Sequence, residues 1–358
     1  MKTKLLLFSL VLFAFSSLKA HVITVSNNSI SAGHFTNLQI AIDSANVNDT
    51  VYVEGSPTDY GTATITTKIT LIGAGYAVTG AQNNWSSQVD YIYIDSVPHG
   101  SKVSGTKIMG MAVNNNISYS GTFYQVNNVD IERCYVGSGV TILGINWTLT
   151  NNILNYIYNN TGYFGNLLIQ NNFLGYIQYS NQATVTIDHN DFVTNNGSVF
   201  YSISNAMITN NVFYFTNPSN GTNVSNCTYS NNFTVWGSST YANPNLNAYP
   251  GNTGQNNDTT SYYLKVWNDK TIPASTVSQN AIWNYNWSAF VTPTNSSPND
   301  PTTGATDGGL IGVYGGTHPM PNLTGATRIP QMTLLMNNAS VVPVGGNLNV
   351  NFKARVQK

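Results

Sequence analysis

Apolar and polar residues alternate in a short unit that returns six times through the middle of the chain, at intervals of 18 to 21 residues. The copies read VDIERCYV at 129–136, WTLTNNIL at 147–154, LLIQNNFL at 167–174, VTIDHNDF at 185–192, AMITNNVF at 206–213 and CTYSNNFT at 227–234. Alternation with period two is typical of a strand, and a repeat of about twenty residues is typical of a solenoid. We therefore predict that each unit is one coil of a β-solenoid.

The alternation also predicts which side chains face the core. Two positions, two residues apart, are apolar in nearly every copy and should form two inward columns. The first column is Val129, Trp147, Leu167, Val185, Ala206 and Cys227, and the second is Ile131, Leu149, Ile169, Ile187, Ile208 and Tyr229. The residue that follows each inward position should face solvent. In the first copy these residues are Asp130 and Glu132, and in the last copy they are Thr228 and Ser230.

A fixed Asn interrupts the alternation at the corner of each coil, and Cys134 takes its place in the first copy. Asn tolerates left-handed backbone, and its amide can bond both to the backbone and to the Asn of the next coil, about 4.8 Å away. We therefore predict a structural ladder formed by Asn152, Asn172, Asn190, Asn211 and Asn232. The alternative is that these amides bind a ligand.

The same register separates the two cysteines. Cys134 and Cys227 lie five coils apart, which is roughly 24 Å at strand spacing. A disulfide needs Cα atoms within about 7 Å of each other. We expect two unpaired core residues, with a reactive thiol or an intermolecular bridge as the alternative.

Upstream of the repeats, a short helix is expected. TNLQ at 36–39 matches a capping box, and Leu38, Ala41, Ile42 and Ala45 follow at helical spacing. The first strand is expected within 48–55. A helix lying over the open edge of that strand would block further strand pairing, so it should form an N-terminal cap.

The N-terminus has the pattern of a secretory signal peptide. Lys2 and Lys4 precede an apolar stretch that ends at Phe15, and cleavage is expected near Ala20. The stretch is too short to span a bilayer, and no later segment is apolar enough to do so. We expect a secreted or cell-surface protein that is not an integral membrane protein.

Charged residues make up only 8% of the chain, against about 25% in an average soluble domain. Loss of Lys2, Lys4 and Lys19 with the signal peptide would leave ten basic residues against 14 acidic ones. Such a balance does not attract nucleic acid electrostatically, so a nucleic-acid partner is not expected.

Three stretches resemble one known family. They are FTNLQIAIDSANVNDTVYVEG at 35–55 with ITLIGAG at 69–75, the NN-containing coils, and DGGLIGVYGG at 307–316. Together they are similar to the secreted bacterial pectin-lyase-like proteins. The resemblance implies an all-β, right-handed parallel β-helix. That superfamily includes pectate lyases, polygalacturonases and members without known catalysis, so the fold alone does not assign a reaction.

We divide the chain into four parts. Residues 1–20 are the signal peptide, 21–240 the parallel β-helix, 241–325 irregular final coils and long loops, and 326–358 closing strands. In the last part, apolar and polar residues alternate from Leu348 to Val356 after the turn-like GGN. This strand is expected to pair with 331–344 and to close the solenoid, and a separate small β-module is the alternative.

Few residues suit catalysis. A lyase of this family needs a basic side chain beside several Asp ligands, but between residues 114 and 264 the basic side chains are Arg133 and His189. Arg133 lies near Asp130 and Glu132 and is expected to be solvated or paired with acid, with a catalytic base as the alternative. A glycosidase needs two carboxyl groups about 5–9.5 Å apart.

Asp188, His189 and Asp191 form the densest titratable cluster and are the candidate catalytic or calcium-binding residues. A surface role is the alternative for all three. No cofactor is expected, although calcium could bind in the loop that carries Asp300 and Asp307.

Aromatic residues suggest a binding role instead. Aromatic faces, amides and hydroxyls hold neutral sugars. Tyr156, Tyr158, Tyr176 and Tyr179 follow the corners of two successive coils, and Trp283, Tyr285 and Trp287 alternate along the chain. Burial in the core is the alternative for both groups.

The sequence thus favours a non-catalytic extracellular protein with a surface, adhesive or neutral-glycan-binding role. Its partner would be a polysaccharide or a cell-surface glycan. The alternative is a divergent polysaccharide lyase or glycoside hydrolase.

Overall fold

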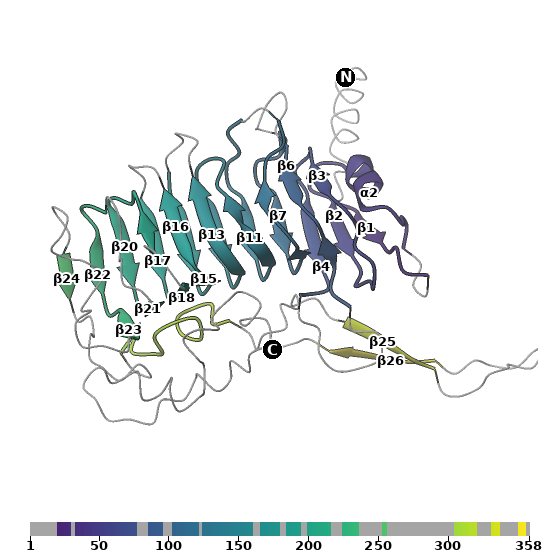
Figure 1. The fold of residues 1–358 in the computed structure, drawn as a ribbon. Helices are drawn as coiled ribbons and strands as arrows, with labels where there is room; N and C mark the ends of the chain where they lie inside the picture. The colour runs from purple at the N-terminus through teal and green to yellow at the C-terminus, as the bar shows by residue number, and fades with distance from the viewer. Residues whose placement is uncertain are drawn as a thin grey trace, which may run out of the picture.

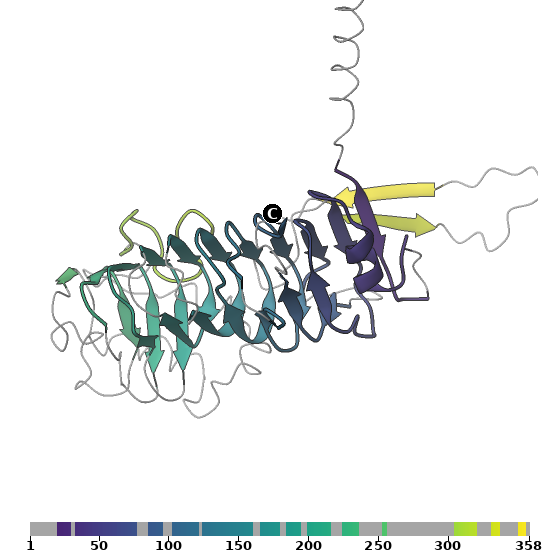
Figure 2. The ribbon, with the colours of Figure 1, turned by 90° about the horizontal axis from the view of Figure 1, so that it is seen from above.

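A computed structural model describes thirteen stretches of the chain. They are residues 20–29, 33–76, 85–95, 102–121, 124–159, 165–179, 184–194, 199–215, 224–235, 253–255, 304–320, 331–336 and 350–355. Two parallel sheets wind through most of them and form a β-solenoid, with coils that stand in a row along an elongated body (Figures 1 and 2). The predicted all-β parallel solenoid is confirmed.

The first sheet contains eleven strands within the described residues. In spatial order they are β1 (Val22–Val25), β2 (Thr50–Val53), β4 (Thr70–Gly73), β7 (Lys107–Met109), β10 (Asp130–Glu132), β12 (Trp147–Thr150), β14 (Leu167–Gln170), β17 (Val185–Asp188), β20 (Ala206–Thr209), β22 (Thr228–Ser230) and β24 (Thr253–Gln255). Sequence order and spatial order agree, because each coil adds one strand to the growing edge.

The second sheet contains thirteen strands within the described residues. Its main path is β3 (Ala63–Ile65), β6 (Ile92–Ile94), β9 (Ile117–Ser118), β11 (Tyr135–Thr141), β13 (Ile153–Asn159), β15 (Phe173–Leu174), β18 (Asp191–Thr194), β21 (Val212–Phe215) and β23 (Phe233–Val235). Four further strands are β5 (Gln88–Val89), β8 (Ala112–Val113), β16 (Tyr176–Tyr179) and β19 (Phe200–Tyr201). Of these, β16 pairs with β13 and β19, and β5 pairs with β8, which also pairs with β11.

The predicted register between the repeats is confirmed. Ile131 pairs with Leu149, and the same column continues through Ile169, Ile187 and Ile208. Every member of the two inward columns is at most 2% exposed. Alternation fixes the inward face because a shift by one residue would turn the whole apolar set outward.

Two outward positions differ from the prediction. Thr150 and Gln170 are buried, at 7% and 8% exposure. Gln170 lies at the corner of the coil, where its amide donates to Asp188 Oδ2 at 3.1 Å. Met207 does face outward and is 53% exposed.

The predicted N-terminal cap is α2 (Leu38–Ser44), which contacts β1, β2 and β3. Leu38, Ala41 and Ile42 form its buried side, as predicted. The capping residue is Asn37, whose side chain accepts from Ile40 N, rather than the first residue of the TNLQ box. Gln39 bonds instead to the backbone of Thr64 in β3, which ties the helix to the solenoid.

The last described strands, β25 (Gln331–Met336) and β26 (Val350–Arg355), pair antiparallel with each other. Among the described residues they join neither sheet of the solenoid. Their role in closing the solenoid stays a prediction.

Candidate functional site

Each corner between the two sheets is made by two adjacent residues. The first has a positive φ and therefore left-handed backbone. These residues are Arg133 (54°), Asn151 (59°), Asn171 (54°), His189 (53°), Asn210 (57°) and Asn231 (52°). The left-handed turn thus lies one residue before the fixed Asn, which corrects the sequence interpretation. Asn is enriched at such positions because its short polar side chain tolerates this backbone.

The second corner residue forms the predicted ladder. Asn152, Asn172, Asn190, Asn211 and Asn232 are each at most 1% exposed. Each Oδ1 accepts the backbone N–H of the equivalent residue one coil earlier, at 2.8 to 3.0 Å. Each Nδ2 donates to a backbone carbonyl of the preceding coil, at 2.7 to 2.9 Å. The amides are fully engaged in the core, so the ladder is structural.

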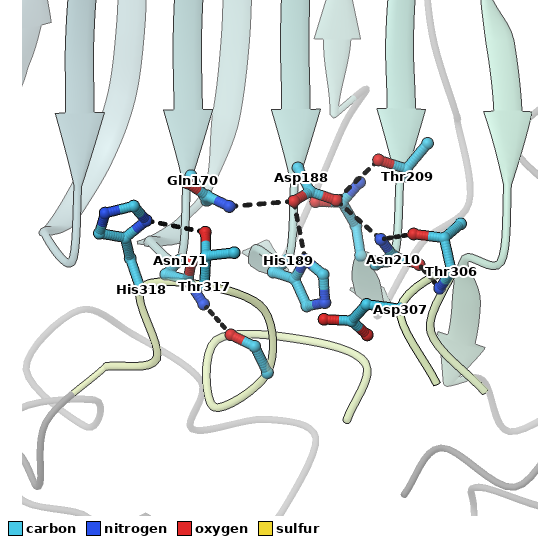
Figure 3. A network of polar contacts seen from close by, with 12 residues as sticks. Gln170, Asn171, Asp188, His189, Thr209, Asn210, Thr306, Asp307, Thr317 and His318 are labelled. Atoms are coloured by element: carbon cyan, nitrogen blue, oxygen red, sulfur yellow. Dashed lines mark hydrogen bonds and ion pairs between the residues drawn. The ribbon is translucent and has the colours of Figure 1, made fainter. Parts of the chain in front are cut away.

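Residues 304–320, called the strap below, cross the outside of the same corners (Figure 3). Asn171 Nδ2 donates to Val313 O and Gly315 O, at 2.9 and 2.8 Å. Asn210 Oδ1 accepts from Thr306 N at 2.8 Å. The amides of two corners, on either side of the His189 corner, therefore hold one distant segment of the chain against the solenoid.

Asp188 and His189 lie at the corner that follows β17, where the strap packs against the His189 ring. The carboxylate of Asp188 contacts His189 Nδ1 at 2.8 Å, and it accepts from Thr209 Oγ1 at 2.7 Å and Asn210 Nδ2 at 2.8 Å. Burial alone would raise the pKa of Asp188, but these hydrogen bonds and the charge of His189 lower it overall. Asp188 is therefore an ionised acceptor at neutral pH.

His189 is 2% exposed, and its Nε2 has no hydrogen-bond partner among the described residues. Gly315 and Gly316 of the strap lie against its ring. Asp307 belongs to the strap, and its Oδ1 accepts from Gly309 N at 2.9 Å. Asp300 lies outside the described residues.

Asp191 lies just past the corner and is 7% exposed. Its Oδ1 accepts from Val313 N at 3.2 Å, and burial raises the pKa of its carboxyl to about 7. Two nearby carboxyl groups thus have pKa values shifted in opposite directions, a pattern that general acid–base pairs use. The strap contacts Asp191 through Val313 N, however, and the side chain of Asp188 is 17% exposed, so neither carboxyl group is openly accessible to a polymer.

The cluster does not resemble a metal site. In the part of the chain that the structure describes, no three His, Cys, Asp or Glu side chains are grouped so that they could hold a metal ion. Arg133, the basic residue expected to pair with acid, is 3% exposed and lies 3.0 Å from Glu132 through its Nε.

The predicted tyrosines lie on the second sheet. Tyr156, Tyr158 and Tyr176 alternate with the fully buried Ile157 and Ile177, so they project from the outer face and are partly exposed. Tyr179 is only 2% exposed, because it lies two residues after the buried Ile177 in β16 and so points to the same, inner side. It therefore does not belong to a surface site. Trp283, Tyr285 and Trp287 lie outside the described residues.

The ring of Tyr156 lies along the solenoid axis. A Cβ at Gly139, its partner on β11, would fall 2.4 Å from the Tyr156 ring, so only glycine leaves room for it. The Tyr156 hydroxyl donates to Asn116 Oδ1 at 3.2 Å, one coil beyond Gly139. Its ring centroid is 5.6 Å from that of Tyr176, with 25° between the ring planes.

Three further tyrosines on this face were not identified from the sequence. Tyr201 packs edge-on against Tyr176, and the rings of Tyr91 and Tyr93 stack 5.6 Å apart. All three are partly exposed. The sequence repeat does not align the strands that carry these tyrosines. Only the pairing of β6 and β19 with their neighbours places them on this face. We call the set the tyrosine face: Tyr91, Tyr93, Tyr156, Tyr158, Tyr176 and Tyr201.

Comparison with known proteins adds no family to this description. No protein-family model, no curated protein and no solved structure matches the chain. None of the helices in the described residues has both the length and the apolar character needed to cross a membrane.

Proposed function

We propose that this chain is an extracellular β-helix protein, related in fold to the pectin-lyase-like family, that binds a neutral glycan on the tyrosine face without cleaving it. The observation that carries the proposal is the alignment of partly exposed tyrosines on one outer sheet face, with Tyr156 and Tyr176 side by side. Aromatic rings supply large apolar contact area, and their hydroxyls supply hydrogen bonds to sugar hydroxyls.

The signal-peptide pattern supports an extracellular location, and the low content of charge supports a neutral ligand. An acidic polymer would need basic side chains on the binding face to attract it. The strands that form the tyrosine face contain no Lys or Arg; they are β6, β9, β11, β13, β16 and β19 of the second sheet.

The test is retention of the purified mature chain on insoluble neutral polysaccharides. Tyr156→Ala and Tyr176→Ala should each weaken binding roughly three- to tenfold, because each removes one stacking surface. The matched control is Tyr52→Ala, which removes a partly exposed, outward tyrosine from β2 of the first sheet. Binding should change little with salt, since it does not depend on ion pairs. Equal losses in all three variants would contradict a role specific to the tyrosine face.

A divergent polysaccharide lyase or glycoside hydrolase is the second candidate. The opposite pKa shifts of Asp188 and Asp191 favour it, and the strap that contacts the buried carboxyl group of Asp191 weighs against it. The protein is incubated with pectic and neutral polysaccharides while unsaturated uronate absorbance and new reducing ends are followed. We expect neither product. Cleavage that disappears in Asp188→Asn or Asp191→Asn would favour the enzyme over the binding protein.

A further inference from the structure

The tyrosine face continues along the solenoid as two columns of outward side chains. Strand register places them in line. One column is Tyr91, Asn116, Gly139, Tyr156 and Tyr176, and the other is Tyr93, Ser118, Thr141, Tyr158, Gln178 and Tyr201. We call these two columns the track.

The track is uncharged along its whole length. It presents rings, hydroxyls and amides, which can stack against sugar rings and exchange hydrogen bonds with sugar hydroxyls. The acids nearest in sequence are Asp90 and Asp95, which flank the end at β6. Asn114 Nδ2 donates to Asp90 at 3.2 Å, and Ser120 Oγ donates to Asp95 at 3.4 Å.

The dimensions of the track suit a narrow, linear ligand. Its two columns are two residues apart on each strand, which is about 7 Å. From β6 to β19 it crosses five strand spacings, or about 24 Å. Rings stand on β6, β13, β16 and β19, and the two coils between β6 and β13 offer Asn116, Ser118 and Thr141 at the same spacing. The ligand that uses all of these coils is a polymer whose unit advances by about one strand spacing.

Among neutral glycans, this condition separates two classes by linkage. In an extended β-1,4-linked chain, successive sugars advance by about 5 Å, close to the spacing of neighbouring strands. An α-1,4-linked chain curls, so it leaves a straight track after a few sugars.

We propose that the track binds an extended, neutral β-1,4-linked polysaccharide that lies along the solenoid axis, with one sugar on each coil from β6 to β19. This inference rests on the proposed glycan-binding function and adds the class, direction and register of the ligand. The reclined ring of Tyr156, which crosses the coil of Gly139 toward Asn116, fits contacts that run along the axis rather than across it.

Calorimetric titration with β-1,4-linked oligosaccharides, from dimers to octamers, tests the register. Affinity should rise roughly two- to tenfold with each added sugar and level off near the hexamer, when every coil of the track is occupied. An α-1,4-linked series of the same lengths should stop gaining affinity after the first few sugars. Affinity that is independent of length, or equal for the two linkages, would overturn the inference while leaving tyrosine-dependent binding in place. Absence of binding to any glycan would overturn the proposed function as well.

A pair of lysine substitutions tests the position of the ligand. Thr141→Lys places a long charged side chain in the middle of the track, whereas Thr148→Lys adds the same group to an outward position of β12 on the other sheet. Thr141→Lys should reduce hexamer affinity at least tenfold, close to the affinity of a short oligomer, and Thr148→Lys should leave it unchanged. Unaltered hexamer binding by Thr141→Lys would contradict an axial ligand. Circular dichroism confirms that both variants keep the fold.

Discussion

At each corner of the solenoid, two adjacent residues meet two different requirements. The first adopts left-handed backbone and offers its side chain outward to the strap, as Asn171 and Asn210 do. The second turns its amide inward and joins the ladder. His189 fills the first position of its coil, where its Nδ1 contacts Asp188 and its ring packs against Gly315 and Gly316 of the strap.

Asn172→Ala should destabilise the protein by about 1–3 kcal/mol, because it leaves buried donors and acceptors of the neighbouring coils without partners. Asn172 has an ordinary negative φ, so the substitution adds no backbone strain. Asn166→Ala is the control, since it removes an exposed amide that bonds to Asn146 at 3.2 Å. Denaturant unfolding measures both. Equal stability of the two variants would mean that the buried ladder contributes no more than a surface contact.

Asp191 should make the stability of the fold depend on pH. Burial raises the pKa of its carboxyl to about 7 in the folded chain, against about 3.9 in an unfolded chain. The folded state therefore holds this proton more tightly, and the free energy of unfolding should fall as pH rises from about 4 to about 7. Asp191→Asn keeps an acceptor for Val313 N and should remove this contribution.

Urea unfolding at several pH values in that window measures the effect. Asp188→Asn is the contrasting variant, because the pKa of Asp188 is lowered and the stability it contributes is lost only in more acidic solution. A slope that persists in Asp191→Asn would assign the titration to another group.

At the level of elements, the strap depends on glycine where it presses on the corner. A Cβ at Gly315 would lie 1.7 Å from Leu310 O and 2.7 Å from His189 Cδ2. Gly315 does not have a positive φ, so the requirement is one of space rather than of backbone conformation.

Gly315→Ala should therefore lift the strap from the corner while leaving the coils intact. The amides of Gly312 and Val313, which donate to Asn210 O and Asp191 Oδ1, should lose protection from hydrogen exchange. Gly309→Ala is the control, because its Cβ would meet only the side-chain oxygen of Asp307, at 3.2 Å. Unchanged exchange in Gly315→Ala would show that the strap is not held by this contact.

The elements also show how far the sequence could be interpreted. The register of β10 to β22 follows from period-two alternation and the fixed Asn, because both act between neighbouring coils. The strap could not be predicted in the same way. Its contacts with Asn171 join residues 142 and 144 positions apart, and DGGLIGVYGG contains no repeat that would align it with a corner.

The tyrosine face was predicted in part for a related reason. Tyr156, Tyr158 and Tyr176 follow the corners and have the outward phase of their strands, whereas the alternation of β16 gives Tyr179 the inward phase. Tyr93 and Tyr201 can be placed on this face only from the pairing of β6 and β19 with their neighbours. The sequence repeat is weak outside the first sheet and does not reveal that pairing.

At the scale of the whole molecule, the core is one continuous cluster that extends from α2 to the last coils. Cys134 and Cys227 lie five coils apart in this core; both are fully buried, and neither forms a disulfide. The predicted absence of a disulfide between them is confirmed. Burial raises the pKa of the Cys134 thiol to about 12, and it raises that of Cys227 as well.

A thiol reagent should therefore label neither cysteine in the folded protein and both after denaturation. The two sites should become reactive together if the solenoid unfolds as one unit, and separately if one half opens first. Mass spectrometry of the labelled chain distinguishes the two cases. Rapid labelling of either thiol in native buffer would contradict the burial of that cysteine side chain.

The equivalence of successive corners has an evolutionary consequence. Because the ladder and the core columns join each coil to its immediate neighbours in the same way, duplication or loss of one unit of about twenty residues would change the length of the body without changing its cross-section. The surface that such a unit carries is copied or removed with it. A lineage could therefore adjust the length of this outer surface by recombination between repeats, without altering any single side chain.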